Sequence, residues 1–82
     1  MTSDVLRSID VQPPPRDLVA LRTGLHSPDA TTREQSASML GDFGAEAAVA
    51  LPDLQSLLHD PVRVVRIRAK WAIETIERKL RM

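Results

Sequence analysis

Cysteine is absent from this sequence of 82 residues, and aromatic side chains are nearly absent, with Phe43 and Trp71 as the two examples. Without cysteine the chain has no disulfide framework, no thiolate metal site and no cysteine nucleophile, which fits a reducing compartment. It also has no run of about 18 apolar residues and no apolar N-terminal signal segment. We therefore expect a cytoplasmic protein without membrane association, whose core consists of aliphatic residues in closely packed helices.

Charge is balanced over the whole chain but unevenly distributed along it. Residues 1–60 hold four basic and nine acidic residues, a net charge of −5, whereas residues 61–82 hold seven basic and two acidic residues, a net charge of +5. Such an asymmetry can orient a partner or favour head-to-tail association. An equally simple interpretation is that cations are favoured near the C-terminus of a helix.

The first 15 residues differ in composition from the rest and end in three consecutive prolines, Pro13 to Pro15. Consecutive prolines favour extended polyproline II geometry and stop a helix before them. The sequence therefore predicts an N-terminal extended arm over residues 1–15, followed by one helical domain over residues 16–82.

The helical domain repeats itself with a period of 33 residues. When residues 17–49 are laid over residues 50–82 without a gap, leucines, histidines, prolines and arginines coincide: Leu18 with Leu51, Leu21 with Leu54, Leu25 with Leu58, His26 with His59, Pro28 with Pro61, and Arg33 with Arg66. A fixed period with matches at helical spacing is typical of stacked repeats. We expect two repeats, at about residues 16–44 and 45–82.

Each repeat is predicted to be a helix, a turn and a second helix. In the first repeat we expect helices over residues 17–26 and 28–43, with Ser27 as the N-cap, Pro28 at the first helical position and Gly44 as the C-cap. In the second repeat Asp60 and Pro61 give the same signal before a helix over residues 61–80. Pro52 leaves two alternatives for the preceding helix, which either begins near Leu51 or kinks there.

Several of these positions resemble a known repeat family. The segments Gly44-Ala45-Glu46-Ala47-Ala48 and Ala50-Leu51-Pro52-Asp53-Leu54, followed by Leu57-Leu58, Asp60-Pro61, Val65-Arg66, Ala69 and Ala72-Ile73, resemble the short HEAT-like repeat of bacterial and phycobilisome-lyase-type proteins. The resemblance implies an all-α fold, with two helical hairpins stacked as a short right-handed α-solenoid that serves as a protein-binding scaffold. It also implies that Arg33 and Arg66 pair with acidic groups near the turns, here Asp29 and Asp60.

The last predicted helix is apolar on two sides. A helical wheel places one set of residues on a core face: Val62, Val65, Ala69, Ala72, Ile73, Ile76 and Leu80. Val64, Ile67 and Trp71 fall on the opposite side, where a terminal repeat is normally polar. We predict that this side, with Arg68 and Thr75 beside it, binds a partner protein or larger assembly. A second copy of the chain and the N-terminal arm are the alternative occupants.

Basic residues on a flank of the same helix, Arg63, Arg66, Lys70 and Arg78, raise nucleic-acid binding as a second functional class. Glu74 is spaced to pair with Lys70 and Arg78, and Glu77 to pair with Arg81, which would neutralise much of the flank. A net charge of zero and the lack of stacking aromatics also argue against a nucleic-acid interface.

Catalysis has little support in the sequence. His26 and His59 occupy equivalent positions in the two repeats, where each can interact with the C-terminus of a helix. No third ligand at metal spacing, glycine-rich phosphate loop or nucleophile–base pair accompanies them. We expect a non-enzymatic protein without a metal or other cofactor.

Overall fold

The computed structural model describes residues 17–82, and every regular element in this range is helical. Three α-helices of increasing length, α2 (Leu18–Gly24), α3 (Ala30–Phe43) and α5 (Arg63–Leu80), are joined by a short turn and by a mixed segment. That segment consists of the 3₁₀-helix η1 (Gly44–Ala50), the α-helix α4 (Leu51–Ser56) and the 3₁₀-helix η2 (Leu57–His59). The all-α prediction is confirmed for these residues, and the predicted arm over residues 1–15 lies outside them.

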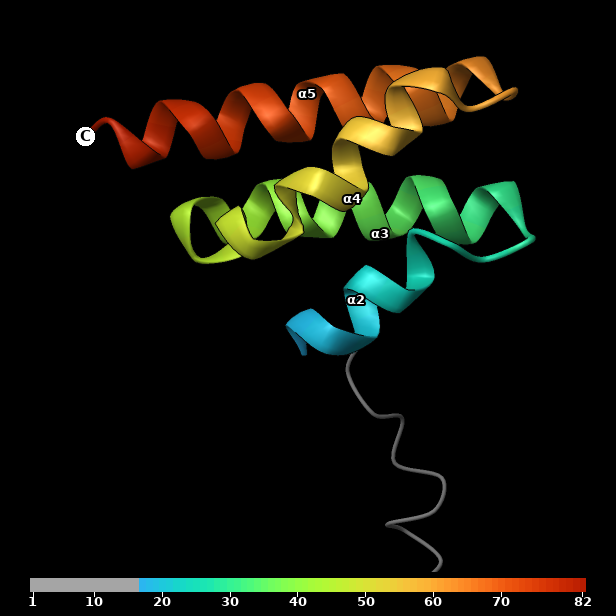
Figure 1. Cartoon of the computed structure of the whole chain (residues 1–82), viewed down its shortest axis with the longest axis horizontal. Coiled ribbons are helices and arrows are strands. Elements are labelled where there is room, and N and C mark those ends of the chain that lie inside the picture. The colour runs from blue at the N-terminus through green and yellow to red at the C-terminus, as the bar shows by residue number, and fades with distance from the viewer. Residues whose placement is uncertain (1–16) are drawn as a thin grey trace, which may run out of the picture.

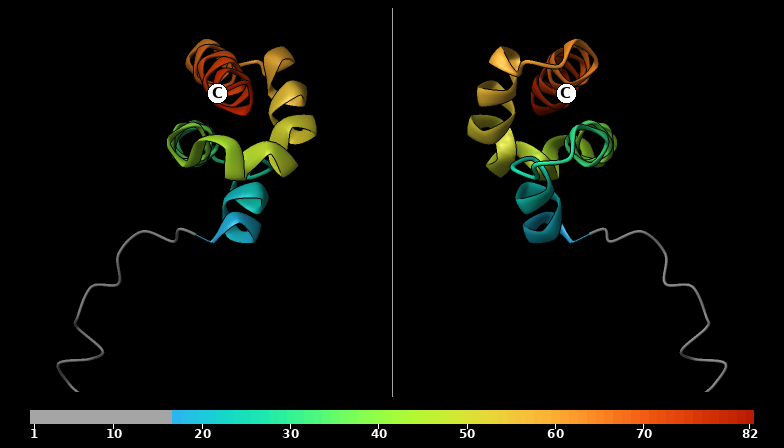
Figure 2. Two further views of the ribbon diagram at one scale, coloured as in Figure 1. Left: turned by 90° about the vertical axis from the view of Figure 1, so that its left-hand side faces the viewer. Right: turned by 90° about the vertical axis from the view of Figure 1, so that its right-hand side faces the viewer.

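The two longest helices determine the arrangement of the others. α3 and α5 lie side by side and run in the same direction, and they form the most extensive helix–helix contact of the fold (Figure 1). α2 runs back against α3, and the η1–α4–η2 segment runs back against α5. Viewed along the long axis, α3 and α5 form one side of the molecule and η1 and α4 lie beside them (Figure 2). One edge of α5 is therefore left without a neighbouring helix among residues 17–82.

Both long helices begin with the same local structure, displaced by the 33-residue period. The amide of Asp29 donates to the Ser27 hydroxyl at 3.0 Å, and the amide of Val62 donates to the Asp60 carboxylate at 2.9 Å. A hydrogen bond of this kind, from a backbone amide to a side chain two residues before it, holds these residues in a turn and not in a helix. The N-caps are Asp29 and Val62, so the prediction that Ser27 and Asp60 are N-caps is wrong by two residues. Pro28 and Pro61 lie in these turns and not at the first helical position.

The junction between the two repeats depends on one glycine. Gly44 has φ +72°, a left-handed conformation that residues with a side chain rarely adopt, and it follows directly after α3 as the predicted C-cap. Pro52 lies in the first turn of α4. A backbone N–H has no acceptor within the helix there, so proline loses no hydrogen bond. Of the two alternatives for Pro52, the structure therefore shows a helix that begins at Leu51.

The core consists of leucines, alanines and β-branched residues, as the scarcity of aromatics predicts. Its fully buried side chains include Leu25, Leu40, Leu54, Val65 and Ile76. The alanines of the core let α3, η1 and α5 approach closely. Leu80, predicted to face the core, is instead half exposed. α5 has 18 residues against 14 in α3 and extends past its end, so Leu80 has little to pack against (Figure 1).

Candidate protein-binding surface

Besides Leu80 at its C-terminal end, α5 exposes three large apolar side chains, and we call these three the outer face. Val64 is 43% exposed, Ile67 is 52% exposed and Trp71 is 38% exposed. They recur at three- and four-residue spacing, which puts them on one side of the helix. Exposed apolar residues that are contiguous in this way mark interaction surfaces more often than scattered ones do. The prediction that these residues lie away from the core is confirmed for Val64 and Ile67.

Trp71 is only partly outward and leans onto α3. A Cβ atom added to Gly41 would lie 2.4 Å from Cζ3 of the Trp71 ring, so the ring occupies the space that any other residue at position 41 would fill. Gly41 is buried and lies in the last turn of α3. One edge of the indole thus packs between the two helices, while the other edge stays on the surface.

The remaining two predicted contact residues differ from each other. Arg68 is exposed, and its Nε donates to Oε2 of Glu34 on α3 at 3.2 Å, which ties the two long helices together at the edge of the outer face. Thr75 is only 7% exposed, so its placement on the binding surface was wrong. α5 packs on η1 as well as on α3, which widens its buried sector to include this position. The Thr75 hydroxyl is buried without a hydrogen-bond partner among residues 17–82.

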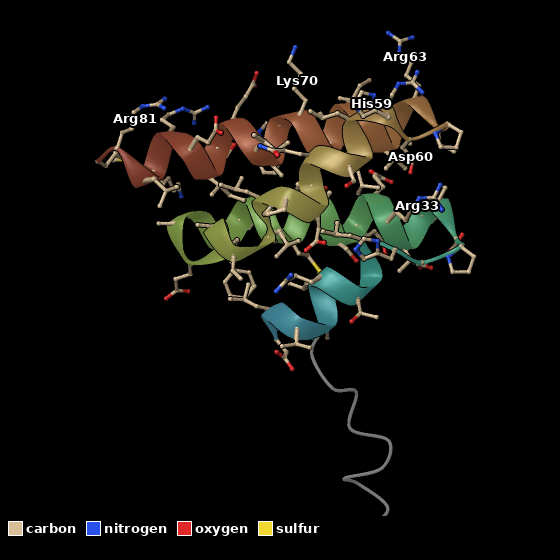
Figure 3. All side chains as sticks on the ribbon, viewed as in Figure 1. Arg33, His59, Asp60, Arg63, Lys70 and Arg81 are labelled. Atoms are coloured by element: carbon tan, nitrogen blue, oxygen red, sulfur yellow. The ribbon has the colours of Figure 1, made fainter. Side chains whose placement is uncertain are left out.

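The basic residues of α5 extend along its exposed side. Arg63, Lys70 and Arg81 point away from α3 (Figure 3), and Arg78 is also exposed. Over residues 17–82 there is no ion pair within α5, so the predicted neutralisation by Glu74 and Glu77 is not observed. Arg63, Lys70 and Arg78 therefore flank the outer face without an acidic partner among residues 17–82.

Arg66, assigned to the same flank, belongs instead to a polar cluster at the start of α3 and α5. Its Nη1 donates to the backbone oxygen of Asp60 at 2.6 Å. The Asp60 carboxylate is buried and accepts from Nε and Nη2 of Arg33 at 2.8 Å and 3.1 Å. The side-chain hydrogen bonds from Arg33 hold the pKa of Asp60 below its ordinary value, against the opposing effect of burial. The Val62 amide and the charge of Arg66 act in the same direction as Arg33.

Of the two acidic partners expected for Arg33 and Arg66, Asp60 takes part in this cluster and Asp29 does not. Arg33 reaches across to Asp60 of the second repeat, and Asp29 instead accepts from the hydroxyl of Thr32 at 2.9 Å. The signal that could have found the pairing is the period itself. Asp60 occupies the position of Ser27, so only the second repeat has a carboxylate at this particular position of the turn.

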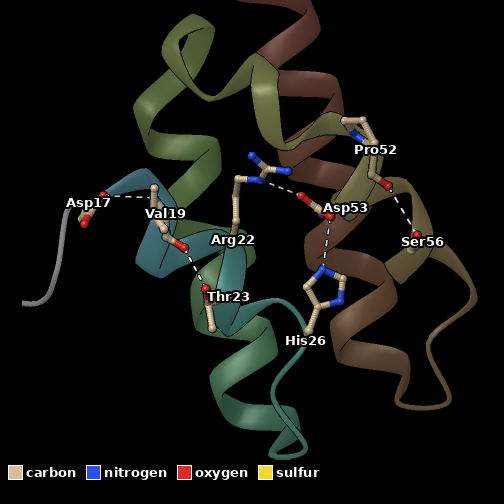
Figure 4. Close-up of polar contacts among 8 residues, drawn as sticks. All are labelled: Asp17, Val19, Arg22, Thr23, His26, Pro52, Asp53 and Ser56. Atoms are coloured by element: carbon tan, nitrogen blue, oxygen red, sulfur yellow. Dashed lines mark hydrogen bonds and ion pairs between the residues drawn. The ribbon is translucent and has the colours of Figure 1, made fainter.

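A second polar contact joins the two repeats between α4 and the end of α2. Asp53 of α4 accepts from Nε of Arg22 at 2.8 Å and lies 3.1 Å from Nε2 of His26 (Figure 4). The hydrogen bond from Arg22 lowers the pKa of Asp53, burial opposes it, and His26 adds to the lowering. His59, the equivalent of His26, is exposed. The described residues contain no group of three acidic or histidine side chains that could hold a metal ion.

Comparison with known proteins does not add a relative. No protein-family model, curated protein or solved structure matches the chain. From Asp17 to Met82, none of the helices is both long enough and apolar enough to cross a membrane. The surface of α5 is therefore the feature from which a function can be argued.

Proposed function

We propose that this chain is a non-catalytic protein–protein interaction module that docks a partner or larger assembly through the outer face of α5. The proposal rests on the exposure of Ile67, which is more than half exposed between Val64 and Trp71 on the longest helix. An apolar centre within a rim of Arg63, Arg68 and Lys70 has the composition of a protein interface, whose core is apolar and whose rim is charged. Aromatic and arginine anchors of this kind dominate binding energy.

The proposed architecture is a pair of HEAT-like hairpins stacked as a short solenoid. It is supported by the contacts that recur with the 33-residue period at Ser27 and Asp60, and by the parallel course of α3 and α5. About three stacked repeats are usually needed to bury a continuous core, so two repeats gain from an additional surface. A partner on the outer face of α5 provides one.

Two other occupants of the same surface are supported by charge. A second copy of the chain is favoured by the −5 and +5 halves of the sequence. Nucleic acid is favoured by Arg63, Lys70 and Arg78, which are exposed without ion pairs among residues 17–82. Nucleic acid does not explain why Ile67 and Val64 occupy the centre of the surface, because phosphate groups do not select aliphatic side chains.

Ile67→Asp is the variant that tests the proposed function. A charge in the centre of the outer face would have to be desolvated on docking, so we expect the dissociation constant for the partner to rise at least about tenfold. The partner is recovered with the tagged full chain by crosslinking, and its affinity is then measured by calorimetry.

Val49→Asp is the matched control, because Val49 is 51% exposed but lies on η1. It should leave the affinity unchanged. Equal affinities for the Ile67 and Val49 variants would reject the outer face as the docking surface. Recovery of nucleic acid instead of protein would support the alternative function.

A further inference from the structure

Arg33 and Arg66 are held in the same way, one repeat apart. Nη1 of Arg33 donates to the backbone oxygen of Ser27 at 2.8 Å, and Nη1 of Arg66 donates to the backbone oxygen of Asp60 at 2.6 Å. Each arginine thus binds the carbonyl six residues before it, at the start of its own helix. The two guanidinium groups are therefore presented alike to whatever stacks beyond each helix.

What stacks beyond them differs. Beyond α3 comes the second repeat, whose Asp60 carboxylate receives Nε and Nη2 of Arg33. Beyond α5 no carboxylate among residues 17–82 accepts a hydrogen bond from the Arg66 side chain. The cluster thus contains two guanidinium groups and one buried carboxylate. A guanidinium has donors for a bidentate carboxylate, and such pairs are among the strongest polar contacts in proteins.

We propose that Arg66 is a specificity site for a carboxylate at the turn of a helical hairpin in a partner protein. The partner hairpin stacks on α5 as the second repeat stacks on α3, and its acidic turn residue binds Arg66 as Asp60 binds Arg33. This inference rests on the proposed function and specifies the partner. The net charge of +5 over residues 61–82 favours an acidic partner surface in the same place.

The same 33-residue shift specifies two further positions in the partner. Glu34 of α3 accepts a hydrogen bond from Arg68, and the residue of α5 that is equivalent to Glu34 is Ile67. The partner residue that takes the place of Arg68 should therefore be apolar. Gly41 of α3 makes room for the ring of Trp71, and the residue of α5 that is equivalent to Gly41 is Glu74. The side chain of Glu74 leaves no room for an indole. The partner residue that takes the place of Trp71 should be small.

A second copy of this chain does not meet the specification. Its first repeat would offer Ser27 to Arg66 and Gln35 to Ile67, so it brings neither a carboxylate nor an apolar side chain. Its second repeat has the carboxylate but would set Arg68 against Ile67 and Trp71 against Glu74. The surface is therefore matched better by a hairpin of a different sequence than by either repeat of residues 17–82.

A fusion supplies the specified hairpin in a defined form. A copy of residues 44–82, with Arg68→Leu and Trp71→Ser in the copy alone, is joined after Met82 of the full chain by a flexible Gly/Ser linker of roughly 20 residues. The linker is needed because α5 has no turn at the position where α3 ends. The equivalent of Gly44 is Glu77, and α5 continues past it to Leu80. Trp71 of the full chain is then the only tryptophan, and its emission during a urea titration reports docking.

We expect the copy to dock, and we expect Arg66→Gln in the full chain and Asp60→Asn in the copy each to weaken docking about tenfold. The double variant should be no weaker than either single one, because both remove the same pair. The Asp60→Asn change keeps an acceptor for the Val62 amide, and the unfused Arg66→Gln chain controls for its own stability.

Other outcomes would overturn the inference. Absence of docking would reject the hairpin, and docking with additive effects would reject Arg66 as the carboxylate site. If a 20-base-pair DNA duplex bound the unfused chain and Arg66→Gln weakened that binding, the anion would be a phosphate. Self-association lost in Arg66→Gln would identify a second copy. The proposed function fails separately, if the natural partner binds the Ile67→Asp chain normally.

Discussion

Asp60→Ala is expected to lower the free energy of unfolding by about 3 kcal/mol, because breaking a buried ion pair leaves the other charge without its partner. The Asp60 carboxylate accepts two hydrogen bonds from Arg33 and one from the amide of Val62. Alanine would leave the side chain of Arg33, which is only 14% exposed, with its contact to Ser27 alone. It would also leave the amide of Val62, directly before α5, without an acceptor. Chemical denaturation of the full chain measures the change.

Asp53→Ala is the matched control, since it removes an aspartate that also bridges the two repeats. The side chains of its partners Arg22 and His26 are 42% and 60% exposed, so the loss should not exceed about 1 kcal/mol. The folded state lowers the pKa of Asp60, so its contribution is present above the unfolded pKa of about 3.9 and disappears as the pH falls through the lower folded value. The wild type and Asp60→Ala should therefore converge in acid. Equal losses for the two variants at neutral pH would contradict the buried cluster.

Gly41→Ala is expected to destabilise the chain by about 1 kcal/mol, although alanine is normally the better helix former by a similar amount. The new Cβ would lie 2.4 Å from Cζ3 of Trp71, so the ring must leave the groove between α3 and α5. Its displacement removes apolar area from the interior and exposes the indole to water. The emission of Trp71 should shift to the red as the midpoint of unfolding falls.

The effect of Gly41→Ala on stability should change sign when the ring of Trp71 is absent. In a Trp71→Ala background, Gly41→Ala should stabilise the chain by about 1 kcal/mol, because only the helix propensity remains. The coupling between the two positions would then be about 2 kcal/mol, measured by a double-mutant cycle. If Gly41→Ala stabilised both backgrounds equally, Trp71 would not pack on α3, and its whole side chain would belong to the outer face.

Much of the fold could be predicted from local sequence signals. The prolines, the glycine at position 44 and the leucine spacing determined where helices begin and end to within about two residues, since these signals act through the backbone of nearby residues. The core face of α5 was also predictable, because burial of Val65, Ala69, Ala72, Ile73 and Ile76 follows directly from helical periodicity.

The contacts between repeats were not predictable in the same way. Thr75 and Trp71 lie at the boundary between the buried and exposed sectors of α5, and the width of the buried sector depends on η1 and α3. The partner of Asp60 likewise depends on how the second repeat stacks, since Arg33 and Asp60 are 27 residues apart. A helical wheel contains no information on either point, because it describes one helix without its neighbours.

The most direct test of the account is the accessibility of the outer face in the isolated chain. The sequence has no cysteine, so Ile67→Cys and Val49→Cys each introduce a single thiol at positions of nearly equal exposure, 52% and 51%. Labelling with a maleimide at low protein concentration should proceed at similar rates for both. Slow labelling at position 67 alone would show that the chain or a second copy already covers the outer face, which would contradict its role as an open docking surface.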